Sequence, residues 1–408
     1  MSGAPAAGPA WVGEGGCLAV GGVPVTRLAE RVGDRPFFAY DRARLTARAA
    51  ELRRALPPGV ELSYAVKANP MPAVVQHMAG LVDGFDVASA GEMQTALDTP
   101  VPAARISFAG PGKTAAELRQ AVAAGVLINL ESAEQLRLAA RIGAELGLAP
   151  RVALRINPDF AVRGGGLSMG GGAKAFGIDA DQAPALLAAM PGLGVAFEGF
   201  HIFGGSQNLH AEAVTAMQAG AIELAVGLAR HAPGPVLYLN IGGGFGIPYF
   251  ANDRPLDLDA VGRALGPLAE RARAALPRAR LVVELGRYLV GEAGVYVCRV
   301  VDRKVSHGTV FLVTDGGLHH HLAATGNFGQ VVRRNYPVVI ANRMDEPPCE
   351  TAEIVGRLCT PIDTLGRAVP VPAARIGDLV AVLQSGAYGP SASPAAFLGH
   401  APPAEILV

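Results

Sequence analysis

The sequence predicts an α/β protein in which a parallel (β/α)8 barrel of the TIM type is followed by a C-terminal all-β domain. From about residue 60, eight short apolar runs alternate with longer stretches whose apolar residues recur at helical spacing. Apolar runs without polar alternation are typical of parallel strands that helices cover on both faces. Beyond Glu284 the helical stretches stop, and β-type runs broken by Gly, Pro and Asn follow.

The eight barrel strands are predicted at the segments LSYAVKA, GFDVAS, RISFAG, VLINLES, RVALRINP, VAFEGFHIF, VLYLNIGGG and LVVELGRYLV. Most of them are joined by amphipathic segments such as residues 115–125 and 132–147, which predict helices. Eight regular strand–helix units fit a closed barrel. A doubly wound open sheet is the alternative, and the regularity of the units favours closure.

The domain boundaries follow from the changes in pattern along the chain. Gly, Ala and Pro dominate the N-terminus, which predicts a flexible segment over residues 1–17. Residues 18–44 contain FFAYDRARL and are expected to join the β-domain by adding a strand. The barrel is then predicted over 45–284 and the β-domain over 285–408.

The composition excludes several classes of function. Lys plus Arg and Asp plus Glu number 35 each, so no net charge attracts nucleic acid or an anionic membrane. The N-terminus lacks a basic start with an apolar core, and no apolar run is long enough to span a membrane. The 4 cysteines form no CxxC pair, so neither a disulfide framework nor a zinc site is indicated. These features predict a cytoplasmic protein.

Polar residues gather where the predicted strands end, which is where barrels of this type carry their chemistry. The first strand ends at Lys67, the sixth carries His201, the eighth carries Glu284, and the seventh runs into GGGFG (242–246). Taken singly, each has an ordinary explanation: a solvated charge, a core histidine, a turn. Their convergence on one rim of the barrel predicts a functional site. The same rim carries Asp86, Ser89, Arg155, Asn157 and Arg287.

These residue types together suit one kind of molecule. A lysine in an enclosed pocket can lose its proton and form an imine with an aldehyde. Consecutive glycines between a strand and a helix would present backbone N–H groups at a helix N-terminus to a phosphate. A buried glutamate can hold a proton on a heterocyclic nitrogen, and an imidazole can stack on a flat ring. An aldehyde, a phosphate and a basic ring nitrogen on one molecule describe pyridoxal 5′-phosphate.

Ordered motifs along the chain then match a known family. YAVKANP, FDVAS, HIFGGSQ, GGGFG, ELGR, LCTPID and GAY occur in the order of the fold-type III pyridoxal phosphate-dependent decarboxylases. The chain resembles the diaminopimelate decarboxylases and, more distantly, the ornithine and arginine decarboxylases, over nearly all of residues 35–395. This resemblance implies a cofactor-binding barrel followed by a β-domain, in agreement with the strand pattern.

The resemblance also implies the roles of individual residues. Lys67 would form the internal aldimine, and His201 would stack on the cofactor. Glu284 would pair with the ring nitrogen, Arg287 would meet a substrate carboxylate, and the Cys359 thiol would return a proton after CO2 loss. Further contacts to the cofactor are implied for Asp86, Ser206, Gly243, Gly244, Gly246 and Tyr388. Contacts to the substrate are implied for Arg155 and Asp363.

In this family the cysteine and Asp363 come from the partner subunit, which implies a homodimer with its active sites at the interface. The run His319 to His321 does not predict a metal site, because adjacent strand residues point to opposite faces. A loop at the substrate entrance is expected there instead, with His320 touching the substrate. The other cysteines, Cys17, Cys298 and Cys349, are expected to be small buried hydrophobic residues.

Departures from the family pattern concern the substrate. Thr360 and Pro361 follow the cysteine where diaminopimelate decarboxylases have a glutamate that binds the distal amino group. DGGLHHHLAATGNFGQ (315–330) replaces the segment whose Arg and Tyr bind the distal carboxylate. These features resemble a branch associated with exosortase systems or acting on glutamyl groups carried by an acyl-carrier protein. The predicted substrate is therefore an amino acid or aminoacyl unit with an amide- or thioester-linked end, with meso-diaminopimelate as the alternative.

Two other functions of this fold are disfavoured by single residues. Racemases of the fold place an arginine opposite the ring nitrogen, and Glu284 stands here. Non-catalytic members that regulate partners tend to lose the lysine or the cysteine, and both Lys67 and Cys359 are present.

The segment GPGKT (110–114) resembles the end of a nucleotide-binding loop. The pattern G-x-x-x-x-G-K-[ST] requires a glycine at the position of Ser107, so the loop is incomplete. Thr114 and Glu117 instead predict a capping box for the helix that follows. The segment is predicted to be the turn between the third strand and its helix.

Overall fold

The computed structural model describes residues 11–33, 35–160, 167–168, 172–250, 252–328, 330 and 333–408, without the side chains of residues 14, 167 and 168. The chain divides into two compact units. One consists of Arg48–Ile247 and Pro255–Tyr288, and the other of Met1–Ala47, Pro248–Arg254 and Leu289–Val408. The first unit thus extends a few residues beyond the expected boundary at 284 and omits a short internal segment.

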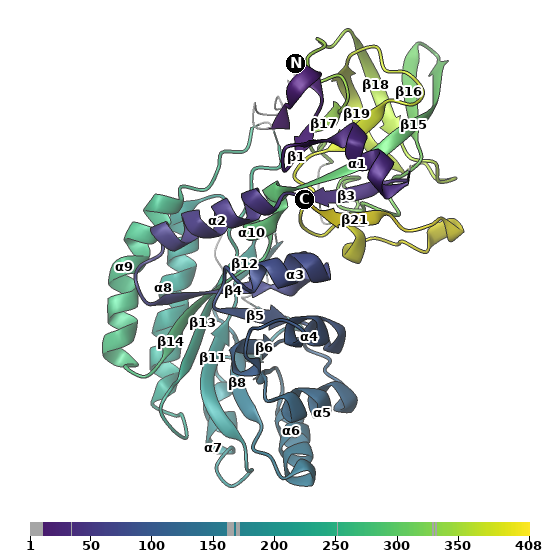
Figure 1. Cartoon of the computed structure of the whole chain (residues 1–408). Helices are drawn as coiled ribbons and strands as arrows, with labels where there is room; N and C mark the ends of the chain where they lie inside the picture. The colour runs from purple at the N-terminus through teal and green to yellow at the C-terminus, as the bar shows by residue number, and fades with distance from the viewer. Residues whose placement is uncertain are drawn as a thin grey trace. The chain divides into compact units, whose positions relative to one another are not determined.

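The first unit is a closed parallel barrel, as the sequence predicts (Figure 1). Neighbouring strands pair in parallel all the way round, and β7 closes the barrel by pairing with β8. The barrel strands are β4 (Val60–Ala65), β5 (Gly84–Val87), β6 (Ile106–Phe108), β7 (Leu127–Leu130), β8 (Arg151–Asn157), β11 (Ala196–Ile202), β13 (Tyr238–Gly243) and β14 (Arg280–Leu285). The short β10 (Ile178–Asp179) pairs with β8 at the side.

Helices cover the outside of these strands. Figure 1 shows one group of helices, α3 to α6, on one side of the barrel and the long pair α8 and α9 on the other. Every residue of β5 and of β7 is buried, which explains why these strands read as continuous apolar runs. The helices are α2 (Arg42–Ala55), α3 (Pro72–Met78), α4 (Ala90–Leu97), α5 (Ala115–Ala124), α6 (Ala133–Leu146), α7 (Ala183–Ala188), α8 (Ala211–Ala229) and α9 (Leu258–Ala275).

The second unit is a mainly antiparallel sheet with the strand order β17-β20-β15-β16-β18-β19. Its long strand β15 (Gly294–Ser306) also pairs with β3 (Phe37–Tyr40), which lies in the FFAYDRARL segment. In turn, β3 pairs in parallel with β21 (Ala404–Leu407). The remaining strands are β16 (Thr309–Thr314), β17 (Val338–Ile340), β18 (Glu350–Val355), β19 (Thr364–Val371) and β20 (Leu379–Val382).

The N-terminal stretch is more ordered than the sequence suggests. Residues 1–10 lie outside the described part of the chain, but Trp11 is only 7% exposed and packs in the core of the second unit. The guanidinium carbon of Arg44 lies 3.7 Å from the centroid of the Trp11 ring. The Met344 N–H donates to the Gly16 carbonyl at 2.7 Å. One large aromatic ring thus anchors the start of this glycine-rich stretch, and the flexibility expected of residues 1–17 stays a prediction.

A short helix also lies beyond the expected end of the barrel. It is α10 (Arg287–Val290), which has 4 residues and closely follows β14. The prediction that helical structure ends at Glu284 is wrong to that extent. No helix within the described residues is both long enough and apolar enough to cross a membrane.

Candidate functional site

Lys67, His201 and Glu284 meet at the C-terminal end of the barrel strands. Lys67 lies in the turn of 3-10 helix Val66–Ala68 after β4, His201 lies in β11, and Glu284 lies in β14. His201 Nε2 lies 2.9 Å from Glu284 Oε2, and Lys67 Nζ lies 3.9 Å from Glu284 Oε1. One carboxylate thus faces an imidazole with one oxygen and an ammonium group with the other.

The surroundings of Glu284 keep it ionised. Burial alone would raise the pKa of this carboxyl, but the hydrogen bond and charge of His201, with the charges of Lys67 and Arg155, lower the pKa to about 2. Burial lowers the pKa of His201, which favours the neutral ring. In the neutral ring that bonds to the ionised Glu284, Nε2 carries the hydrogen and donates it to the carboxylate. The buried Nδ1 of His201 has no hydrogen-bond partner among the described residues. The pair therefore offers a fixed negative charge and one open imidazole nitrogen.

Asp86 is a second buried carboxyl group at this end of the barrel. Ser107 Oγ hydrogen-bonds to Asp86 Oδ1, and Oδ2 has no partner among the described residues. Burial and the nearby charge of Glu284 raise the pKa of Asp86 to about 8, against the hydrogen bonds from Ser107 and Ser63 and the charge of Lys67. At neutral pH Asp86 is therefore a protonated acid that can donate a hydrogen bond.

Asn240 is a residue of the site that the sequence reasoning missed. Its Nδ2 donates to Glu284 Oε2 at 3.2 Å and to the Tyr238 hydroxyl at 3.1 Å, and all three side chains are buried. Asn240 lies within β13, two residues before the glycine run, and a polar residue inside an otherwise apolar strand was the available signal. Glu284 Oε2 therefore accepts hydrogen bonds from both Asn240 and His201.

Arg155, expected to bind substrate, already has a partner inside the barrel unit. Its Nη1 donates to Glu131 Oε1 at 2.9 Å, and both side chains are buried. Its guanidinium also lies over the ring of Phe176, 5.1 Å from the centroid. Glu131, at the end of the fourth predicted strand segment, was not singled out from the sequence. Contact of Arg155 with substrate stays a prediction, with one of its nitrogens committed to this ion pair.

The lysine of GPGKT is a buried structural residue. Lys113 Nζ donates to the carbonyls of Gly110 and Asn129, at 2.8 and 2.6 Å, and to Gln135 Oε1 at 3.2 Å. Burial lowers the pKa of Lys113 to about 8, although the charge of Glu131 opposes this. The predicted capping box of Thr114 and Glu117 at the start of α5 is confirmed. The segment is the turn before α5 and its lysine faces protein carbonyls.

The glycine run after β13 differs from its prediction in one respect. The next helix, α9, begins only at Leu258, so the expectation that these glycines lie at a helix N-terminus is wrong. The run instead packs on backbone: an added Cβ at Gly243 would lie 2.2 Å from the Glu284 carbonyl oxygen. The Gly246 N–H donates to the Asn208 carbonyl at 2.8 Å, so it is engaged within the protein. Binding of phosphate by Gly243, Gly244 and Gly246 stays a prediction, as does that of Ser206 in β12 (Gly205–Ser206).

In the second unit, Cys359 lies in the loop between β18 and β19 and is exposed. An exposed thiol fits the implied role in proton transfer better than the ordinary role of a buried cysteine. Cys298 is buried, as expected, but Cys349 is exposed, so the expectation of burial is wrong for Cys349. Tyr388 has a positive φ of 54°, and its ring centroid lies 6.0 Å from that of Phe328.

The histidine run forms a buried turn in the second unit. Burial lowers the pKa of His320 to about 4, and both its ring nitrogens are engaged: Nδ1 with the Tyr296 hydroxyl at 3.0 Å, Nε2 with the Ala401 carbonyl at 2.9 Å. These bonds leave it no nitrogen for the substrate, which disfavours the expected contact. Both ring nitrogens of His319 are buried without a partner among the described residues. No group of three or more His, Cys, Asp or Glu in the described part of the chain is arranged to hold a metal ion.

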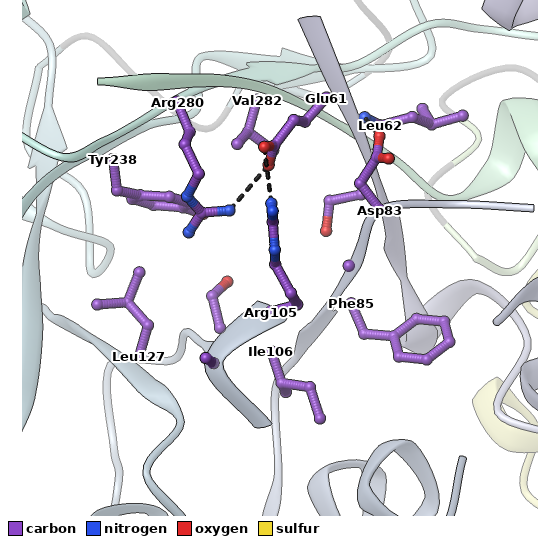
Figure 2. Close-up of a pocket in the computed structure, with 14 residues that line it drawn as sticks. Glu61, Leu62, Asp83, Phe85, Arg105, Ile106, Leu127, Tyr238, Arg280 and Val282 are labelled. Atoms are coloured by element: carbon purple, nitrogen blue, oxygen red, sulfur yellow. Dashed lines mark hydrogen bonds and ion pairs between the residues drawn. The ribbon is translucent and has the colours of Figure 1, made fainter. Parts of the chain in front are cut away.

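The opposite end of the barrel carries a different kind of structure (Figure 2). Figure 2 shows Glu61 between two arginines: its carboxylate lies 2.6 Å from Arg105 Nη1 and 2.8 Å from Arg280 Nη1. The pocket there is small, with a volume of about 20 Å³, and its lining includes Ser63 and Ser107. All three charged groups lie at the N-terminal side of their strands, the end of such barrels that serves stability.

The residues at the C-terminal end suit pyridoxal phosphate. The Lys67 side chain is 42% exposed beside groups that are almost fully buried, so its amine reaches open space at the barrel mouth. Glu284 is ionised and hence able to hold a proton on a ring nitrogen, while His201 and Asp86 each keep a buried polar atom without a protein partner among the described residues. These are the features that a flat, charged heterocycle requires.

Comparison with known proteins agrees with this assignment. Residues 42–291 match the model of the pyridoxal binding domain of pyridoxal-dependent decarboxylases. A similar protein is the L-glutamyl-[BtrI acyl-carrier protein] decarboxylase of Niallia circulans, 37% identical over 94% of this chain and 90% of the relative. The diaminopimelate decarboxylase of Zymomonas mobilis is 31% identical over 92% of this chain and 87% of the relative.

Solved structures show the same architecture. A protein of Aquifex aeolicus superposes with a TM-score of 0.82 at 28% identity, covering 96% of this chain and 90% of that one. The diaminopimelate decarboxylase of M. jannaschii gives a TM-score of 0.87 over 97% of this chain and 92% of that one, and at 24% identity this likeness shows the fold alone. The chain therefore belongs to the pyridoxal-dependent decarboxylases of fold type III, and its cofactor is pyridoxal phosphate.

Proposed function

We propose that this decarboxylase removes the α-carboxylate of an amino acid or aminoacyl unit whose far end is linked as an amide or thioester to a conjugate or carrier protein. The observation that carries the proposal is the buried turn at His319 to His321, which stands where diaminopimelate enzymes of the family clamp a distal charge. Both ring nitrogens of His320 are held within the protein, by the Tyr296 hydroxyl and the Ala401 carbonyl, so this side chain offers no such clamp. A site without a clamp for a second amino acid centre suits a substrate whose far end is linked.

Two relatives support this substrate class by what their names say of them. The Niallia circulans relative acts on a glutamyl group held by an acyl-carrier protein. A Staphylococcus aureus relative, 30% identical over 90% of this chain and 93% of its own length, is a 2-[(L-alanin-3-ylcarbamoyl)methyl]-2-hydroxybutanedioate decarboxylase. In that name the amino-acid unit is joined through a carbamoyl group. Both names thus describe an amino-acid unit that is joined to a larger group, where diaminopimelate carries a second amino acid centre.

Pyridoxal phosphate, when bound, supplies an electron sink for the electron pair that remains at the substrate Cα when CO2 leaves. Lys67 supplies the amine that holds the cofactor's aldehyde carbon. Glu284 would keep a proton on the ring nitrogen, and His201, whose orientation Glu284 fixes, would lie against the ring. Arg287 meets the substrate carboxylate. The Cys359 thiol then donates a proton to Cα, a role that suits its exposure.

We further propose a homodimer in which each Cys359 serves the active site of the partner subunit, as in the family. Mixing two inactive variants, Lys67→Ala and Cys359→Ala, tests this arrangement. Heterodimers formed by mixing would contain one site with both native residues, so part of the activity returns. If subunits exchange and no activity returns, the cysteine serves its own subunit.

The substrate class is tested by CO2 release from a panel of compounds. The panel holds meso-diaminopimelate, lysine, ornithine, arginine, glutamate, a glutamyl amide and a glutamyl group on a carrier protein. We expect kcat/KM to be highest for the linked compounds and low for meso-diaminopimelate. A kcat/KM for meso-diaminopimelate that equals or exceeds that of every linked compound would establish the lysine-pathway alternative instead.

A further inference from the structure

Asp363 joins two loops of the second unit through its carboxylate. Oδ1 accepts a hydrogen bond from the Leu318 N–H at 2.6 Å, and Oδ2 accepts one from the Leu358 N–H at 2.9 Å. The side chain is almost fully buried. One carboxylate therefore holds the backbone of the histidine turn with one oxygen and the backbone of the cysteine loop with the other.

Two glycines leave the space that this carboxylate fills. A Cβ added at Gly317 would lie 2.2 Å from Asp363 Oδ1, and one added at Gly356 would lie 2.2 Å from Oδ2. The Gly356 N–H also donates to the Asp363 carbonyl at 3.0 Å, which closes the cysteine loop on itself. The carboxylate is thus packed between two backbones and has no room to swing toward another partner.

Each of the two leucines whose N–H binds Asp363 is followed in the chain by a residue with a reactive or titratable side chain. Leu358 precedes Cys359, whose thiol is exposed, and Leu318 precedes His319, whose two ring nitrogens are buried without a partner among the described residues. Since both carboxylate oxygens hold backbone, Asp363 is poorly suited to the substrate contact that the sequence implied. Its geometry suits a different task, that of fixing the two loops relative to each other.

We propose that Asp363 is a positioning residue that sets the Cys359 thiol for proton transfer by holding its loop to the His319 turn. This inference rests on the proposed function in assigning the proton transfer to Cys359. A proton donor must lie within hydrogen-bond reach of the carbon it protonates, so a small displacement of the loop lowers the rate of that step. Substrate binding before that step depends on other residues, so kcat falls and KM changes little.

The experiment compares Asp363→Asn and Gly317→Ala with the native holoenzyme. The amide retains the size of the side chain but places an N–H2 group against one of the two N–H donors. The added methyl group displaces the native carboxylate without changing its charge. Asp302→Asn, an exposed carboxylate of the same unit, is the matched control.

The readout is the alkylation rate of Cys359 by iodoacetamide, followed by peptide mass spectrometry, with exposed Cys349 as the internal reference. We expect both variants to change the Cys359 rate several-fold at a constant Cys349 rate, and to lower kcat by roughly tenfold to a hundredfold at nearly constant KM. The control leaves both rates and kcat unchanged. A merely destabilising substitution would raise the alkylation of both cysteines together, and that outcome counts against the proposal.

The proposal is overturned if both variants are folded, retain the cofactor absorbance and show the native Cys359 rate and kcat. Its failure is distinguishable from failure of the proposed function. If Cys359→Ala turns over like the native enzyme, the assigned proton donor is wrong, and the kinetic half of the inference falls with it. A selective change in Cys359 alkylation in the Asp363 variant still establishes that the carboxylate holds the loop.

Discussion

His201 Nε2 and Glu284 Oε2 lie 2.9 Å apart in the buried end of the barrel, and this hydrogen bond settles the state of both groups. The carboxylate accepts a hydrogen bond from the imidazole N–H, so it remains ionised although burial favours its neutral form. The imidazole is held in one orientation with its other nitrogen open. A fixed negative charge and a fixed ring are what a pyridinium cofactor needs, so the predictions begin with this pair.

Replacing Glu284 by Gln removes the charge and retains the shape of the side chain. We expect kcat to fall by about two orders of magnitude or more, because the ring nitrogen loses the partner that keeps it protonated. Steady-state kinetics with the best linked substrate measure the effect. The matched control is Glu61→Gln at the opposite end of the barrel, which breaks the partly exposed pairs with Arg105 and Arg280. It is expected to change stability by about 1 kcal/mol or less and to leave kcat intact.

Replacing Lys67 by Ala removes the amine at the barrel mouth. We expect the purified variant to lack the visible absorbance of lysine-bound pyridoxal phosphate and to be inactive, since no other group is proposed to hold the aldehyde carbon. Absorbance spectra before and after borohydride reduction, with mass analysis of the reduced peptide, measure the attachment. An unchanged visible band in the variant would assign the attachment to another residue.

Replacing Lys113 by Met tests whether the lysine of GPGKT stabilises the fold or binds a nucleotide. The carbonyls of Gly110 and Asn129 and the amide oxygen of Gln135 would each lose a hydrogen-bond donor, so the free energy of unfolding is expected to fall by about 1–3 kcal/mol. Urea denaturation measures this, with exposed Lys174→Met as the control. ATP is expected to leave the melting temperature of the native protein unchanged. Stabilisation by ATP that the Lys113 variant loses would restore the nucleotide-loop reading.

The burial of His321 predicts that the folded protein loses stability in acid. Burial lowers its pKa to about 3, well below the usual histidine value of about 6.5 in the unfolded chain. Between these values the unfolded state binds a proton that the folded state does not, so stability falls as the pH decreases. The slope is about 1.4 kcal/mol per pH unit, or about 2 kcal/mol between pH 6.5 and pH 5.

The measurement is the free energy of unfolding of the native protein and of His321→Gln at several pH values. The variant is expected to lose this part of the pH dependence, whatever its stability at neutral pH. Exposed His231→Gln serves as the control and is expected to retain the native slope. Parallel curves for the native protein and His321→Gln would mean that the buried ring does not control the acid transition.

The sequence predicted the barrel and the convergence of three site residues on one rim for a physical reason. Parallel strands place their C-terminal ends on one rim, so Lys67, His201 and Glu284 had to meet once eight apolar runs were recognised. The partners of Arg155 and Asp363 depend on side-chain geometry across distant segments, and no local pattern encodes them. Trp11 is the same case, since its burial against Arg44 depends on contacts with residues far along the chain. The glycine run was misplaced at a helix start although Pro248, Asn252 and Pro255 are residues that favour a loop before Leu258.

The pairing of β21 with β3 has a consequence for synthesis on the ribosome. The barrel unit is complete in the chain by Tyr288, whereas β3, near the N-terminus, gains its last neighbour only when residues 404–407 emerge. The barrel can therefore form during translation while β3, already made, still lacks both of its neighbours, β15 and β21. The cysteine loop and the histidine turn lie in the unit that closes last. The loop that carries Cys359 is thus made only after the chain of the barrel unit is complete.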